Sequence, residues 1–185
     1  MDPGAASADL GLLGLLDNGV MWWGLAACGS AQLSKLLIEL VVHRRWNPKV
    51  LIETGGMPSS HSALMTGCAA GIGWQLGFAS PLFALAATLC FVVLYDASGV
   101  RRAAGLTAAR VNVLAAASDG SERDGTNRKP LKENLGHTRL EVLVGSLMGP
   151  LVALPGLVLV GSPWQLAIAW GWVHPLVQPL SQPLG

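Results

Sequence analysis

Long apolar stretches separated by short polar ones dominate this chain. A helix needs about 20 mainly apolar residues to cross the hydrocarbon core of a membrane. Five stretches approach that length: Val20–Val42, Ser60–Phe78, Pro81–Asp96, Leu140–Val160 and Pro163–Leu180. The first four predict transmembrane helices. Prolines interrupt the fifth, so a kinked span and a helix lying in the interface are both open. The pattern predicts an all-α fold, a polytopic membrane helix bundle with four to five transmembrane helices.

We interpret the whole chain as a single membrane domain, with no tandem repeat. Its parts follow in order: an N-terminal segment (1–19), three spans (20–99), a polar segment (100–137) and one or two final spans (138–185). Within the polar segment, residues 101–118 are rich in Ala and predict a short helix along the inner surface. Residues 118–130 are polar, contain Gly and have no aromatic residue, which is typical of a mobile linker.

Positive charge is concentrated in two stretches, 43–59 and 100–137, which hold ten of the twelve Lys and Arg residues. Two predicted spans separate these stretches, so both lie on the same side of the membrane. An excess of Lys and Arg in short loops marks the cytoplasmic side. We therefore expect an integral membrane protein with these loops in the cytoplasm, in a bacterial inner membrane or an organellar membrane. Acidic residues where a signal peptide carries basic ones argue against a cleaved signal.

The amino-acid composition also indicates that lipid, rather than water, surrounds most of the chain. Hydrophobic residues make up 51% of the chain and charged residues 12%, whereas a soluble domain carries roughly 25% charged residues. A net charge of +1 and the lack of a basic stripe argue against a nucleic-acid partner. Cys28, Cys68 and Cys90 have no metal-ligand spacing, so we expect no metal and no other cofactor. The expected partners are membrane lipids, and an oligomer or a larger membrane complex is also compatible with the pattern.

The densest chemical signal is the stretch GGMPSSHS, residues 55–62. Gly55 and Gly56 allow a tight turn, and Ser59 or Ser60 can cap the helix that follows. The free N–H groups of such a turn and the helix dipole together favour an anion such as phosphate. His61 would lie on the first helical turn, near the cytoplasmic interface. A simple helix cap with an interfacial histidine explains the same residues equally well.

A second signal opens the fourth predicted span. His137 and Glu141 are four residues apart, so they share a helix face, and the carboxylate can accept a hydrogen bond from one ring nitrogen. Such a bond fixes the tautomer and makes the other nitrogen more nucleophilic. A structural His–Glu pair is the alternative, but ionisable groups that enter a membrane are costly and usually functional.

Further cations lie at the cytoplasmic ends of the spans. Arg101 and Arg102 follow the third span, where arginines commonly anchor topology, but Arg is also the preferred bidentate ligand of phosphate. Asp96 can hold one of them in place. Lys35, inside the first span, can reach the interface or a phosphate there, and we hold both open. Because the ends of these spans meet on one side, the histidines, the carboxylate and the cations can converge, as phosphoryl transfer requires.

Three ordered motifs carry a family resemblance: GGMPSSHSA, YDASGVRRAAG and LKENLGHTRLEV. Together they resemble the divergent branch of the type 2 phosphatidic acid phosphatase superfamily, which also includes vanadium-dependent haloperoxidases. The resemblance covers Lys35 to about Pro150. It implies that His137 is the nucleophile, that Glu141 orients its ring and that His61 gives a proton to the leaving group.

The motifs that are expected to bind phosphate in this superfamily are altered in this sequence. Its first motif, a Lys followed by Arg-Pro, is absent, and Leu131 stands where an arginine is expected six residues before the nucleophilic histidine. Backbone N–H groups and other cations would then hold the phosphate: Ser59, Ser60, Arg101, Arg102, Lys35 and Lys132.

These observations predict a membrane phosphatase that hydrolyses a phosphate monoester through a phosphohistidine intermediate. A site at the membrane edge suggests a lipid phosphate, and phosphatidylglycerophosphate and phosphatidic acid fit equally. Two alternatives stay open. The chain could be a non-catalytic scaffold or assembly subunit of a larger complex, or a carrier that binds a phosphorylated lipid without cleaving it.

Overall fold

Helices form every regular element in the part of the chain that the computed structural model describes, residues 14–51, 55–118 and 129–172. The elements in chain order are α2 (Gly19–Val41), a 3₁₀ turn η1 (Pro48–Leu51), α3 (Ser60–Leu76), α4 (Pro81–Tyr95), a π-helical turn η2 (Asp96–Val100), α5 (Arg101–Ser118), α6 (Arg139–Leu159) and α7 (Pro163–Ala169). The predicted all-helical membrane fold is confirmed.

Within the described residues, three helical segments are long and apolar enough to cross a membrane: Gly19–Val41, Pro81–Ala117 and Arg139–Ala169. The second expected span is the shorter helix α3, whose 17 residues extend about 25 Å at about 1.5 Å per residue. Of the fifth expected span, only the short helix α7 is described, and residues 173–180 lie outside the described part. The described residues therefore support three full-length spans, and the expected count of four to five is not fully confirmed.

Helix α3 lies at the centre of the bundle and contacts α2, α4 and α6. Small residues let the backbones of α3 and α6 approach closely, as they do in other membrane helix pairs. A Cβ atom added at Gly149 of α6 would lie 2.5 Å from the carbonyl oxygen of Ala63 and 2.6 Å from the nitrogen of Gly67. Ala27, Ala31 and Ala63 form the fully buried core between α2 and α3. Even a methyl group at Gly149 would collide with the backbone of α3, so the close approach of α3 and α6 depends on this glycine.

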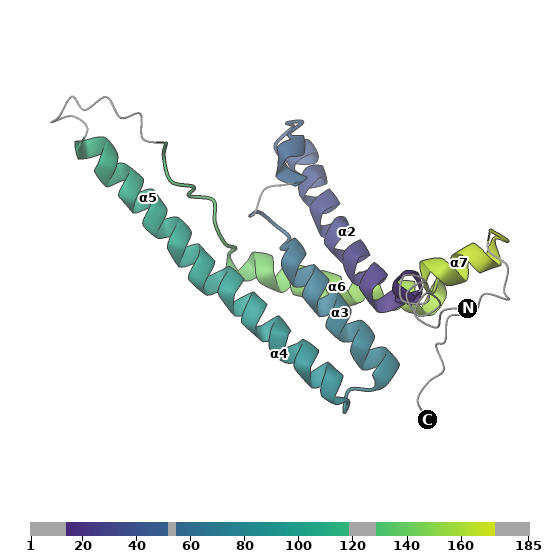
Figure 1. The fold of residues 1–185 in the computed structure, drawn as a ribbon. Coiled ribbons are helices and arrows are strands. Elements are labelled where there is room, and N and C mark those ends of the chain that lie inside the picture. The colour runs from purple at the N-terminus through teal and green to yellow at the C-terminus, as the bar shows by residue number, and fades with distance from the viewer. Residues whose placement is uncertain (1–13, 52–54, 119–128, 173–185) are drawn as a thin grey trace, which may run out of the picture.

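Helices α4 and α5 form one straight rod (Figure 1), joined through the π-helical turn η2. The helix predicted for 101–118 is confirmed, but it continues the direction of α4 instead of turning along an inner surface. The physical reason lies in η2. The N–H of Arg101 donates to the carbonyl of Asp96, which keeps the backbone hydrogen-bonded through the turn. Residues 129–137, which we call the strap, run back along α5 without forming a helix (Figure 1).

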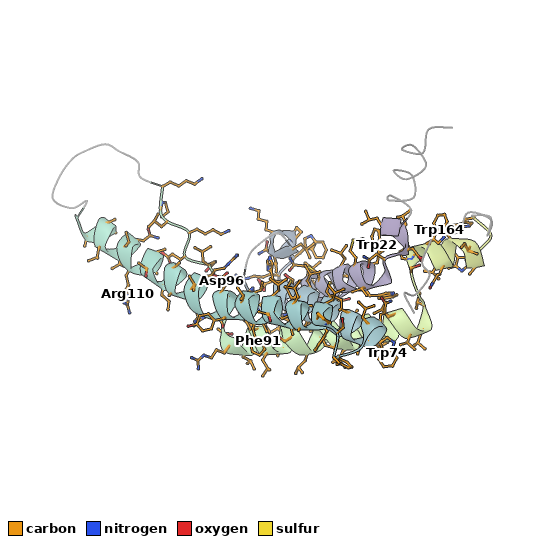
Figure 2. The ribbon with its side chains drawn as sticks, turned by 60° about the horizontal axis from the view of Figure 1, so that its bottom comes forward. Trp22, Trp74, Phe91, Asp96, Arg110 and Trp164 are labelled. Atoms are coloured by element: carbon orange, nitrogen blue, oxygen red, sulfur yellow. The ribbon has the colours of Figure 1, made fainter. Side chains whose placement is uncertain are left out.

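The labelled tryptophans and the labelled charged side chains lie towards opposite ends of the molecule, and we call the end with Asp96 the charged end. Figure 2 shows Trp22, Trp74 and Trp164 towards one end and Asp96 and Arg110 towards the other. The indole N–H of Trp23 donates to the carbonyl of Gly161 at 2.8 Å, which ties the start of α2 to the end of α6. Tryptophans at one end are typical of a membrane–water interface. The end that carries Asp96 is also where α3 and α6 begin.

Candidate active site

Two histidines from distant parts of the chain share one pocket at the charged end. His61 comes from the first turn of α3, and His137 from the end of the strap. The pocket has a volume of about 170 Å³, and its walls include polar and apolar side chains: His61, His137, Asp96, Arg101, Val92 and Val93. Three of the motifs singled out in the sequence therefore meet at this site.

The start of α3 is fixed by its capping serine. Ser59 is fully buried, and its Oγ accepts hydrogen bonds from the N–H and the hydroxyl of Ser62, at 3.3 and 2.9 Å. Its own N–H donates to the carbonyl of Glu141 at 3.0 Å, so this N–H is not available to an anion. Ser60 is also buried, and neither Ser59 nor Ser60 lines the histidine pocket. The serines thus place His61 against α6, and the predicted glycine turn before them contains Gly56 with a φ of +77°.

His137 and Glu141 form the side-chain pair that their spacing predicted. His137 Nδ1 lies 3.0 Å from Glu141 Oε2, and the histidine ring is only 5% exposed. The same carboxylate oxygen accepts a hydrogen bond from the N–H of Thr138 at 3.1 Å, while Thr138 Oγ1 accepts one from the N–H of Glu141 at 3.2 Å. This reciprocal pair is a capping box, which opens α6. Since a carboxylate only accepts hydrogen bonds, Nδ1 carries the proton and Nε2 carries the lone pair.

The backbone around His137 rests on the rod formed by α4, η2 and α5. The N–H of His137 donates to the carbonyl of Ala97 at 2.9 Å. Gly136 has a φ of +76°, and a Cβ atom there would lie 2.7 Å from the carbonyl carbon of Arg101. Only glycine combines this backbone conformation with so close an approach. The end of the strap therefore lies in close contact with η2, and this contact holds the ring of His137 at the pocket.

The cations predicted to hold phosphate do not all reach the pocket. Arg101 lines it, and its Nε donates to Asp96 Oδ2, as we expected for one of the two arginines. Arg102 and Lys132 are exposed, and neither lines the histidine pocket. Among the cationic side chains that the structure describes, Arg101 is the one that this pocket contains.

Lys35 lies in a second pocket, on the other side of Glu141. This pocket has a volume of about 500 Å³, and Lys35, Glu141, Gly55 and Gly56 are among the residues that line it. Lys35 is only 3% exposed, and it forms no hydrogen bond or ion pair with the residues that the structure describes. Its ammonium group therefore shares a pocket with the carboxylate that orients His137, and it does not share one with the two histidines.

No group of three or more His, Cys, Asp or Glu side chains within residues 14–51, 55–118 and 129–172 is placed to hold a metal ion. The polar side chains that line the histidine pocket carry two imidazole rings, a carboxylate and a guanidinium group: His61, His137, Asp96 and Arg101.

A family model described as the Divergent PAP2 family matches residues 16–152, a range that contains both pockets. The chain belongs to the divergent PAP2 family. It is also similar to the uncharacterized membrane protein YuiD of Bacillus subtilis (strain 168). The two are 38% identical over 149 residues, which cover 76% of this chain and 94% of the relative. No solved structure gave a significant match. The family resemblance that the three motifs predicted is confirmed.

In this member of the divergent PAP2 family, motif reasoning singled out both histidines, Glu141 and Arg101, which the structure brings close together, and it missed the contacts of the strap. The capping box had a readable signal, because Thr138 stands three residues before Glu141. The backbone contact between His137 and Ala97 had none, since it joins segments 40 residues apart and uses no side chain.

Proposed function

We propose that this chain is a membrane phosphatase that hydrolyses a phosphate monoester through a phosphohistidine on His137. One observation carries the proposal: His61 and His137 line one pocket, and Glu141 occupies Nδ1 of His137. The lone pair for attack is then on Nε2, and the carboxylate stabilises the positive charge that the ring gains when this nitrogen forms a bond. Membership in the divergent PAP2 family supports the same chemistry.

In the first step, Nε2 of His137 attacks phosphorus in line with the ester oxygen. The P–N bond forms as the P–O bond breaks, and the electron pair of that bond leaves on the alkoxide. Protonated His61 donates its proton to this oxygen, so an alcohol departs. Across the pocket, His61 belongs to α3 and His137 to the strap, so the two rings can stand on opposite sides of a phosphoryl group.

In the second step, water attacks the phosphohistidine. Neutral His61 accepts a proton from this water, the P–N bond breaks, and inorganic phosphate leaves. His61 is again protonated and His137 is again neutral at Nε2, so the cycle closes without any other reactant.

Arg101 is the cation best placed to balance charge on the transferred phosphoryl group. Its Nε is bound to Asp96, which leaves both Nη groups for the phosphate oxygens. The N–H group of His61 has no acceptor within its own helix, because it belongs to the first turn, and it can add to this stabilisation. Lys35 would act from the second pocket, which it shares with Glu141.

The substrate that we propose is a lipid phosphate, such as phosphatidylglycerophosphate or phosphatidic acid. Val92 and Val93 form part of the pocket wall, and Val92 is 61% exposed on the apolar helix α4. A lipid chain can lie against this wall while its phosphate reaches the histidines. We also propose that the pocket faces the cytoplasm, because the loops beside it carry most of the positive charge.

Phosphate release by the purified protein tests the proposal. We expect turnover of at least one member of a panel containing phosphatidic acid, phosphatidylglycerophosphate and lysophosphatidic acid, and none by the His137→Ala variant. Soluble glycerol phosphate serves as a substrate without lipid chains. Binding of a lipid phosphate without turnover would favour a carrier. Neither binding nor turnover would favour a scaffold or an assembly subunit, and either result would overturn the phosphatase proposal.

A further inference from the structure

Asn112 of α5 binds the far end of the strap through three hydrogen bonds. Its Oδ1 accepts from the N–H of Leu131 at 2.9 Å, and its Nδ2 donates to the carbonyl of Leu131, also at 2.9 Å. The same Nδ2 donates to Glu133 Oε1 at 2.8 Å. One amide side chain thus pairs with both backbone groups of a single residue, as a neighbouring strand would do. Sequence motifs gave Asn112 no role.

Between Asn112 and the histidine, the strap lies directly on the helix backbone. A Cβ atom added at Gly105 would lie 2.6 Å from the carbonyl oxygen of Glu133 and 2.9 Å from that of Leu135. One and two turns further towards η2, the strap meets the backbone of Arg101 at Gly136, and that of Ala97 at His137. Positions 97, 101, 105 and 112 lie on one face of the rod, so the strap follows this face without leaving it.

Only a short piece of chain separates the two ends of the strap, since Leu131 and His137 are six residues apart. It is not fully extended: the N–H of Leu135 donates to the carbonyl of Glu133 at 2.8 Å, which closes a tight turn, and Gly136 has a φ of +76°. A short segment that is held at both ends, and that contacts the helix backbone between them, transmits the position of its anchored end to the other.

We propose that Asn112 is a positioning residue for His137: by anchoring Leu131, it keeps the strap docked on the rod and the ring of His137 at the histidine pocket. This inference rests on the proposed function for its catalytic consequence, but its structural part can be tested separately. Asn112 itself lies about 22 Å along the rod from Ala97, so it does not touch the substrate. If it only supported the fold, its loss would lower stability without changing how the ring of His137 is held.

The test compares Asn112→Ala with Arg110→Ala in the full-length protein. Arg110 is on the same helix, and its side chain points away from the strap (Figure 2). With phosphatidic acid in mixed micelles, we expect Asn112→Ala to lower kcat about tenfold, which corresponds to about 1.4 kcal/mol, with little change in KM. The rate at which diethylpyrocarbonate modifies His137 should rise, because the ring is 5% exposed in the docked state. Exposed His43 is the internal standard, and Arg110→Ala should match the wild type in both measurements.

A charge-swapped pair distinguishes a specific contact from general damage. In Asn112→Asp the acid would face Glu133, and activity should fall. Adding Glu133→Gln restores a donor–acceptor pair between the two side chains, and we expect part of kcat and of the protection of His137 to return. The proposal is overturned if Asn112→Ala changes kcat without exposing His137, or exposes His137 without changing kcat. If the wild-type protein has no turnover, the proposed function fails, and the protection of His137 alone decides whether Asn112 positions the ring.

Discussion

Gly149 offers a direct test of how helix packing sets the distance between the two histidines. The substitution Gly149→Ala adds one methyl group at the contact of α6 with α3. That carbon would lie 2.5 Å from the carbonyl oxygen of Ala63 and 2.6 Å from the nitrogen of Gly67, whereas ordinary contacts begin at 3.4 Å. Both neighbours are backbone atoms of α3, so neither can rotate away, and α3 must move by about 0.9 Å.

We expect Gly149→Ala to lower both the stability and the catalytic rate, and to lower the rate by more. Overpacking of this kind costs about 1–3 kcal/mol of the free energy of unfolding. The larger effect should be on catalysis, because Ala63 is only two residues from His61, and a misplacement of about 1 Å can lower a rate about a hundredfold. We therefore predict that kcat falls far more than the modest loss of stability would suggest.

The assay measures kcat and thermal unfolding of the purified variants in the same detergent. Gly29→Ala is the matched control, because a Cβ atom at this α2 position would meet nothing within 4 Å. The control adds the same methyl group to a helix and should keep wild-type activity. If Gly149→Ala also keeps wild-type kcat and stability, the close contact of α3 and α6 does not set the geometry of the site.

Three further predictions concern the site and its place in the membrane. Glu141→Gln should keep the helical content measured by circular dichroism but lower kcat about 10²- to 10⁴-fold, because an amide cannot balance charge on the ring; an unchanged rate would show that Glu141 only caps α6. Arg101→Ala should lower kcat/KM about ten- to a hundredfold through the loss of a charged contact to phosphate. Arg102→Ala should have little effect, since Arg102 does not line the pocket, and equal effects of the two would refute this assignment. A single cysteine at Asn47, in an otherwise cysteine-free protein, should react only with membrane-permeant thiol reagents, and labelling from outside would reverse the proposed orientation.

The local features of this protein could be predicted from the sequence. Apolar length is enough to predict α2, α4 and α6, and the four-residue spacing of His137 and Glu141 is enough to predict their hydrogen bond, because both signals act within one helix. The clustered motifs also predicted that His61 and Arg101 would approach His137, since all lie at the same ends of antiparallel helices.

What could not be predicted depends on contacts between segments. Lys35 lies on a helix that is apolar nearly all round, so its pattern does not show which side faces Glu141 and which faces the histidine pocket. The hydrogen bonds between Asn112 and Leu131 join residues 19 positions apart in the chain, and no periodic pattern in the sequence indicates them. The straight continuation of α4 into α5 depends on a π-helical turn, which apolar periodicity does not reveal.

The central claim is that His137 carries the phosphoryl group, and trapping the intermediate tests it most directly. Wild-type protein is mixed with a radioactive phosphate ester and quenched rapidly in base, where phosphohistidine survives, and the label is then tested for loss in acid. We predict acid-labile label on the peptide that contains His137 and none in His137→Ala. His61→Ala should still take up label from an aryl phosphate, because that leaving group needs little protonation. Label that persists in His137→Ala and vanishes in His61→Ala would contradict the account, because the two histidines would then have the opposite roles.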